Sequence, residues 1–155
     1  MHRRRKYWIV FVMLAMIVLC CGCGKSDLET SQSYTYDVAT GDKIKITFQT
    51  KGGYVISPDT PFVISKDGNT LSQGTFISKA DYMEYAASIE SASSVTLLDS
   101  GSKGNIEYIY WTNGSSEYDY AILIKDSETG VLLGNNVSQE SAEDCFGRIS
   151  FENVK

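Results

Sequence analysis

Histidine, the side chain that most often moves protons in enzymes, occurs once in this sequence, as His2. A chain without histidine after position 2 cannot build a Ser-His-Asp or Cys-His site, or a zinc or copper site with histidine ligands. No glycine-rich phosphate loop follows a predicted strand and opens a helix. Catalysis by carboxylate pairs or by Ser-Lys remains chemically open, but no motif marks either. We therefore expect no catalytic residues, no metal site and no cofactor.

Cys145 is the one cysteine beyond the first 23 residues. It shares an apolar helical stripe with Ala142 and Phe146, where cysteine behaves as a small apolar side chain. The neighbouring Glu143 and Asp144 disfavour its thiolate. We expect an unreactive core residue.

Oxygen-bearing side chains at predicted turns raise the question of calcium binding. They are Asp99, Asn105, Glu117, Asp119, Asp126 and Glu128. Calcium takes about six to eight oxygen ligands, and an EF-hand loop places them at fixed spacings around a glycine. No segment has that spacing, so turn formation is the favoured interpretation of these residues.

Aromatic side chains gather on two predicted strands, 106–112 and 118–125. They are Tyr108, Tyr110, Trp111, Tyr118 and Tyr120. Because side chains alternate between the faces of a strand, Tyr108 and Tyr110 share one face and Trp111 lies on the other. One face would then be core and the other a candidate ligand surface for a sugar, a peptide or a protein. The alternative is that all these rings pack across strands beneath helices.

The strands follow from apolar residues at every second position. Residues 43–50 alternate cleanly, with Ile44, Ile46 and Phe48 on one face. Asn113-Gly114 marks a hairpin turn between the two aromatic strands. Other strands are predicted at 34–38, 54–56, 62–65, 75–77, 95–98 and 131–133, with a last one from Ile149 to Phe151 and a loop at 99–104.

Two segments have helical spacing instead. Ser78 and Asp81 have the spacing of a capping box and precede an apolar stripe, which predicts a helix at about 78–90. The second helix is predicted at about 139–147, where the cysteine stripe lies.

This order predicts an α+β fold, in which an antiparallel β-sheet is packed by two helices within one domain, 34–155. A β-sandwich is the alternative. The layout is similar to the Mog1/PsbP-like group, with Ala142, Cys145-Phe146 and Ile149-Ser150-Phe151 at its end. The resemblance implies a helix-covered antiparallel sheet and a binding or assembly role without a catalytic motif.

The first residues have the pattern of an export signal. A basic cluster, Arg3 to Lys6, precedes an apolar run over 7–19 and then small residues. This run is shorter than the ~20 residues of a spanning helix, and its positive flank should stay in the cytoplasm. An uncleaved anchor helix is the alternative, and both interpretations place the domain outside.

The segment Leu19-Cys20-Cys21-Gly22-Cys23 resembles a bacterial lipobox. The resemblance implies a signal peptide, 1–22, that is cleaved after Gly22, and a diacylglyceryl group on Cys23; Cys21 is the alternative acceptor. Residues 23–33 would then be a lipidated cysteine and a flexible tether. The domain would lie on the outer face of the bacterial cytoplasmic membrane.

Removal of the first 22 of 155 residues would leave 10 basic and 19 acidic side chains, a formal charge of −9. Such a surface repels phosphate backbones, so no nucleic-acid partner is expected. The expected partners are the membrane, through Cys23, and an envelope protein, peptide or glycan. The leading hypothesis is a non-catalytic, membrane-anchored binding or accessory module. The alternatives are a carboxylate-dependent cell-wall or glycan hydrolase and a structural or assembly subunit of an envelope complex.

Overall fold

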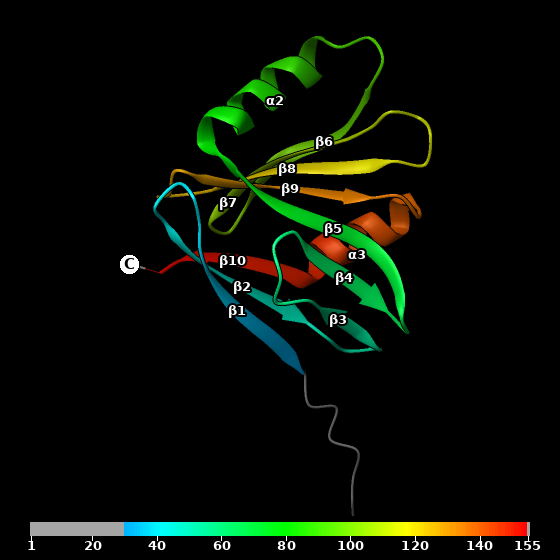
Figure 1. The fold of residues 1–155 in the computed structure, drawn as a ribbon. Helices are drawn as coiled ribbons and strands as arrows, with labels where there is room; N and C mark the ends of the chain where they lie inside the picture. The colour runs from blue at the N-terminus through cyan, green and yellow to red at the C-terminus, as the bar shows by residue number, and fades with distance from the viewer. Residues whose placement is uncertain (1–29, 155) are drawn as a thin grey trace, which may run out of the picture.

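The computed structural model describes residues 30–154, which form two antiparallel sheets and two helices (Figure 1). The smaller sheet has three strands in the order β1-β2-β10. Their bounds are β1 Ser31–Asp37, β2 Lys43–Gln49 and β10 Ile149–Asn153. The predicted α+β fold with an antiparallel sheet and two packed helices is confirmed.

The larger sheet has seven strands in the order β3-β4-β5-β9-β8-β7-β6, and every neighbouring pair is antiparallel. Their bounds are β3 Tyr54–Ile56, β4 Phe62–Lys66, β5 Asn69–Ser78, β6 Thr96–Lys103, β7 Ile106–Thr112, β8 Tyr118–Ile124 and β9 Thr129–Asn135. The strands from β7 to β9 form the meander to which the aromatic residues belong.

The helices are α2, Lys79–Ser91, and α3, Gln139–Arg148. The predicted capping box begins α2: the Asp81 amide donates to the Ser78 hydroxyl at 3.1 Å, and the Ser78 amide donates to the Asp81 carboxylate at 3.0 Å. Ser138 caps α3 by accepting from the Ser141 amide at 3.1 Å.

The two helices lie on opposite faces of the larger sheet. Ala121 packs with α2 residues in one buried cluster, whereas its neighbour Ile122 packs with α3 and the smaller sheet in the main core. Adjacent residues of a strand point to opposite faces, so the molecule has α2 on one side and α3 with the smaller sheet on the other (Figure 1). Ile44, Ile46 and Phe48 of β2 are fully buried, as their alternation predicts.

β5 and β6 extend furthest beyond their predicted bounds, because their residues give a weak apolar signal. β5 starts at Asn69 rather than at 75, and its Gly74 lies against the buried Phe62 ring, which a side chain at 74 would displace. β6 continues to Lys103 through the predicted loop 99–104. All of β6 except Leu98 is exposed, so burial imposes no alternation on it.

At the N-terminal side, β1 begins at Ser31, so the last three residues assigned to the tether pair with β2. The predicted signal peptide, Cys23 and the rest of the tether lie outside the described residues. Among helices of residues 30–154, none combines the length and the apolar character that membrane crossing requires.

Candidate functional site

The aromatic residues of β7 and β8 lie mostly inside the molecule. Tyr110, Tyr120 and Trp111 have exposed fractions of 2%, 3% and 7%, and Tyr108 and Tyr118 are half-buried. Tyr108, Tyr110, Tyr118 and Tyr120 belong to the main core side, and Trp111 lies on the α2 side. A ligand could reach only the two half-buried rings, so the five residues do not together form an exposed surface.

These rings form a continuous stack within the core. Tyr110 and Tyr120 face each other across the strand pair with ring centroids 4.0 Å apart, and Tyr120 stacks on Phe146 of α3 at 4.2 Å. Burial raises the pKa of Tyr110 to about 12. Within the described residues the Tyr110 hydroxyl has no hydrogen-bond partner. On the opposite face, Trp111 stacks on Tyr85 of α2. The aromatic residues therefore hold both helices to the sheet.

Cys145 has an exposed fraction of 0%, and burial raises the pKa of its thiol. Its surroundings thus disfavour the thiolate form that a nucleophile or metal ligand needs. The structure places it in the core, where the helical stripe predicts it.

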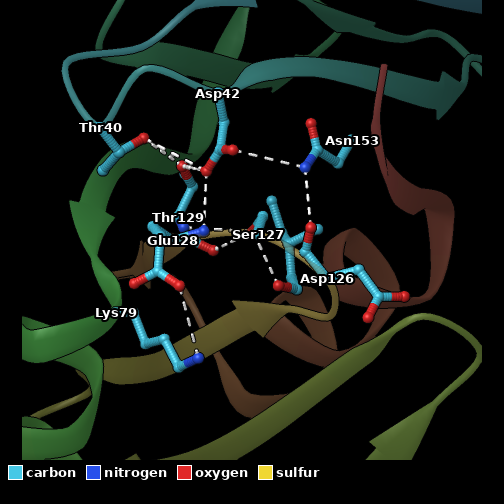
Figure 2. Close-up of polar contacts among 9 residues, drawn as sticks. Thr40, Asp42, Lys79, Asp126, Ser127, Glu128, Thr129 and Asn153 are labelled. Carbon is cyan, nitrogen blue, oxygen red and sulfur yellow. Dashed lines mark hydrogen bonds and ion pairs between the residues drawn. The ribbon is translucent and has the colours of Figure 1, made fainter. Parts of the chain in front are cut away.

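Asp42 is the centre of a polar network that joins the turns at one end of the two sheets (Figure 2). Its carboxylate accepts hydrogen bonds from the Glu128 amide and the Thr129 hydroxyl, both at 2.8 Å. Thr40 and Asn153 donate to it at 3.4 Å. Burial alone would raise the pKa of Asp42, but these hydrogen bonds together hold it below its ordinary value.

Two of the turn acids considered for calcium, Asp126 and Glu128, lie beside this network (Figure 2). Asp126 offers its backbone carbonyl to Asn153, and the Glu128 side chain pairs with Lys79 at 3.6 Å. Elsewhere, Asp99 accepts from the Tyr108 hydroxyl, and the Asn105 side chain donates to the Phe151 carbonyl. Among residues 30–154, no three His, Cys, Asp or Glu residues are grouped so that they could hold a metal ion.

The remaining two turn acids, Glu117 and Asp119, line a pocket of about 340 Å³ on the α2 face of the larger sheet. We call it the Asp119 pocket. Its other lining residues are Pro61, Gln73, Thr75, Leu132, Gly134 and Asn136. They come from β5 and β9 and from the loops before β4 and after β9. The pocket therefore opens on a part of the sheet that α2 leaves uncovered.

Asp119 is an unusual residue for its position. It shares a strand face with Ala121 and Leu123, which pack beneath α2. Burial, and to a smaller extent the nearby Glu117 carboxylate, raises the pKa of Asp119 to about 6. In the described part of the chain its carboxylate accepts no hydrogen bond and faces no cation. It is therefore a half-buried acid that has no protein hydrogen-bond partner among residues 30–154, and its oxygens stay open to water in the pocket.

Gly134 makes room for this carboxylate. The two residues are register partners on β9 and β8, and a Cβ atom at position 134 would lie 3.0 Å from Asp119 Oδ1. The absent side chain leaves the carboxylate open to the pocket. Glu117 has a partner of its own, since the Asn113 side chain donates to its carboxylate.

A second pocket, of about 460 Å³, follows the same sheet face alongside α2. It is lined by Ile77, Asp81, Glu84, Tyr85 and Ser88. Thr75 of the Asp119 pocket and Ile77 of the second pocket lie two residues apart on β5, and hence on the same face. The two pockets together give this side of the molecule a recessed acidic strip that has one aromatic ring.

In the sequence analysis Asp119 counted only as one of several oxygen-bearing residues near turns, for which turn formation was the favoured interpretation. Its half-buried position on the α2 face of the sheet was not predicted. The available signal was alternation: in Tyr118–Ile124, Asp119 falls on the face of Ala121 and Leu123. An acid at an apolar position of a central strand lowers the stability of the fold, which marks it as a site candidate.

Comparisons of the chain with protein-family models, with curated proteins and with solved structures found no significant match.

Proposed function

We propose that this chain is a lipoprotein anchored through Cys23 on the outer face of the bacterial cytoplasmic membrane, and that its domain is a non-catalytic binding or accessory module. The lipobox-like segment and the basic, short apolar N-terminus support the anchor. The scarcity of histidine and of catalytic motifs supports the absence of turnover. The Asp119 pocket supports a binding role and is its proposed site.

The observation that carries the binding role is the half-buried Asp119 carboxyl group, which has a raised pKa and no protein donor among residues 30–154, in a preformed pocket. Half-burial of an acid without a donor or a cation costs stability, and such costs are typically retained where a ligand supplies the missing partner. A pKa of about 6 also means that Asp119 changes its charge close to neutral pH. Ligand binding would then be coupled to ionisation.

The chemistry of the pocket favours a positively charged hydrogen-bond donor. Asp119 and Glu117 supply acceptors, and within the described part of the chain no cationic side chain lines the pocket or its neighbour along α2. An ammonium or guanidinium group would satisfy Asp119 and lower its pKa, which is the reverse of the effect of burial. We therefore assign the ligand to an envelope protein or peptide that presents a lysine or arginine side chain.

A binding assay with a short lysine peptide tests this proposal. Binding to the lipidated mature protein in detergent is compared for the wild type, Asp119→Asn and Asp59→Asn. Asp59 lies in an exposed loop and controls for the lost charge. We expect Asp119→Asn to weaken binding about tenfold, as charged hydrogen-bonded contacts typically do, and Asp59→Asn to leave it unchanged. Equal binding by all three proteins would remove the Asp119 pocket from consideration.

The anchor has its own test. Intact mass spectrometry of the protein purified from membranes should give the mass of Cys23–Lys155 plus a diacylglyceryl group. A mass that retains Met1 would contradict cleavage, and any protein that copurifies in stoichiometric amount would identify the partner directly.

One observation favours the hydrolase alternative. Glu117 and Asp119 line the same pocket, and glycosidases use two carboxyl groups of which one has a raised pKa. That function predicts turnover of cell-wall glycan fragments that survives purification and is abolished by both Glu117→Gln and Asp119→Asn. Such a result would replace the non-catalytic proposal.

A further inference from the structure

β6 forms one edge of the larger sheet. Among residues 30–154 it pairs only with β7, and all of its residues except Leu98 are exposed. The outer side of an edge strand offers backbone donors and acceptors to another strand, which proteins usually prevent with proline, with bulges or with several charged residues. In β6 the features that prevent such pairing lie only toward its ends: a bulge at Leu98 and the charged residues Asp99 and Lys103.

The regular part of β6 is Asp99-Ser100-Gly101-Ser102-Lys103, which we call the edge segment. A bulge at Leu98 precedes it, and a turn at Gly104, with a φ of +59°, follows it. Between them the register with β7 is regular, from Asp99 opposite Tyr110 to Lys103 opposite Ile106. The edge segment is therefore in regular register with β7 and carries small side chains at its centre, Ser100, Gly101 and Ser102.

The backbone groups of Ser100 and Ser102 face outward. Lys103 and Ile106 flank a two-residue turn, so they form the hydrogen-bonded pair that closes the hairpin. Hydrogen-bonded and non-hydrogen-bonded positions alternate along an antiparallel pair, which directs the amides and carbonyls of Ser100 and Ser102 away from β7. The Ser100 amide meets only the adjacent Asp99 Oδ1, at 2.9 Å. An incoming strand can replace that local contact.

The side chains of the edge segment are complementary to a second copy of themselves. The order is acid, serine, glycine, serine, base, with Gly101 at the centre. In an antiparallel pair that places Gly101 opposite Gly101, Asp99 of each copy lies opposite Lys103 of the other, and Ser100 lies opposite Ser102. Opposite charges at directly opposed positions stabilise such a pair, and the arrangement has the two-fold symmetry common in homodimers.

The fold already holds both charges on one face of the sheet. Asp99 accepts a hydrogen bond from the Tyr108 hydroxyl at 2.7 Å, and Lys103 Nζ lies 4.9 Å from the centroid of the Phe146 ring. Cross-strand partners must share a face, so this placement is what the paired charges require. We propose that the protein self-associates through antiparallel β6–β6 pairing about Gly101, which joins the two seven-stranded sheets.

Variants that reverse the charge at position 99 or 103 test this proposal in the full-length protein. The protein is kept in excess detergent, so that two copies rarely share a micelle by chance. Asp99→Lys places lysine opposite lysine twice, and Lys103→Asp places aspartate opposite aspartate twice. Measured by sedimentation, the wild type should dimerise with increasing concentration, and each single variant should associate about tenfold more weakly or worse. The double variant D99K/K103D should recover the wild-type affinity.

A mixture of the two single variants separates this explanation from misfolding. Each Asp99→Lys chain would face a Lys103→Asp chain with two attractive pairs, so heterodimers should form where neither variant forms homodimers. Tyr108→Phe is the matched control, because it removes the hydroxyl bonded to Asp99 and keeps both charges; it should still dimerise. A wild type that stays monomeric up to its solubility limit, single variants that dimerise as the wild type does, or a mixture that does not associate would each overturn the proposal.

Discussion

Replacement of Asp42 should loosen the end of the molecule where the two sheets are joined. The change Asp42→Ala removes the acceptor shared by the Glu128 amide, the Thr129 hydroxyl and the Asn153 side chain (Figure 2). These donors belong to the β8–β9 turn, to β9 and to β10, whereas Asp42 precedes β2. The loss therefore affects contacts between segments far apart in the sequence.

The magnitude follows from the two short hydrogen bonds, both 2.8 Å long. A hydrogen bond to a charged group contributes about 1.5–3 kcal/mol, and water competes for the half-buried Asp42, which favours the lower end. The two bonds at 3.4 Å add little. We expect Asp42→Ala to lower the free energy of unfolding by about 2–3 kcal/mol. Asp42→Asn keeps a neutral acceptor and should cost about 1 kcal/mol, because uncharged hydrogen bonds are roughly half as strong.

Urea unfolding provides the assay, and Trp111 the signal, because it is buried against Tyr85 and is the only tryptophan after position 8. The pKa of Asp42 is lower in the folded state than its ordinary value of 3.8. Its stabilisation is therefore complete above that value and is lost as the pH falls through the folded-state pKa. The difference between the wild type and Asp42→Asn should shrink in acid.

The matched control is Asp37→Asn, which removes the same charge from an 86% exposed side chain at the end of β1. Its ion pair with Lys43 is a surface pair, so the change should stay within about 0.5 kcal/mol. Equal losses from Asp37→Asn and Asp42→Asn, or a difference that does not depend on pH, would refute the assignment of Asp42 as the link between the sheets.

Three further predictions concern the pocket and the core. The folded-state pKa of Asp119 is raised to about 6, so its ionisation destabilises the unliganded fold as the pH rises from about 4 to 6. Asp119→Asn should therefore be more stable than the wild type at pH 7. With allowance for solvent screening, we expect a gain of about 1–2 kcal/mol, measured by thermal unfolding. Gly134→Ala should weaken peptide binding and leave the melting temperature within a few degrees, because its Cβ would press only on the Asp119 side chain. Gly74→Ala should lower the free energy of unfolding in urea titrations by about 1–3 kcal/mol or more, because its Cβ would fall within 2.0 Å of the buried Phe62 ring. Gly147→Ala is the control: open space surrounds position 147, so this change should not destabilise the protein.

Local sequence patterns sufficed for most elements of the fold. Alternation placed β2 and the β7–β8 hairpin, and the Ser78–Asp81 capping box placed the start of α2 within a residue. These signals work because both are local: alternating burial and the hydrogen bonds of a helix cap each involve residues only a few positions apart in the sequence. Only the start of β6 was predicted, as the strand 95–98; its continuation to Lys103 was predicted as a loop, since an edge strand exposed on both faces has no burial pattern to read.

The candidate site shows the opposite case. Asp119 was visible in the sequence as an acid near a turn, but its pocket is built from residues as distant as Pro61, Gln73 and Asn136. The pairing of β5 with β9, across the fifty residues that hold α2, β6, β7 and β8, brings these walls together. Long-range pairing depends on the whole set of strand contacts, which no local window contains.

By itself, the sequence determined the α+β class and the type of most elements, because these depend on residue type and short spacing; it also supplied the N-terminal pattern on which the proposed lipid anchor rests. Only the tertiary structure decided that most of the aromatic rings of β7 and β8 are core and that Asp42 joins the two sheets. It also decided that Asp119 stands half-buried with no hydrogen-bond partner among residues 30–154. The physical reason is that the exposure and ionisation of a side chain depend on what the rest of the chain packs around it.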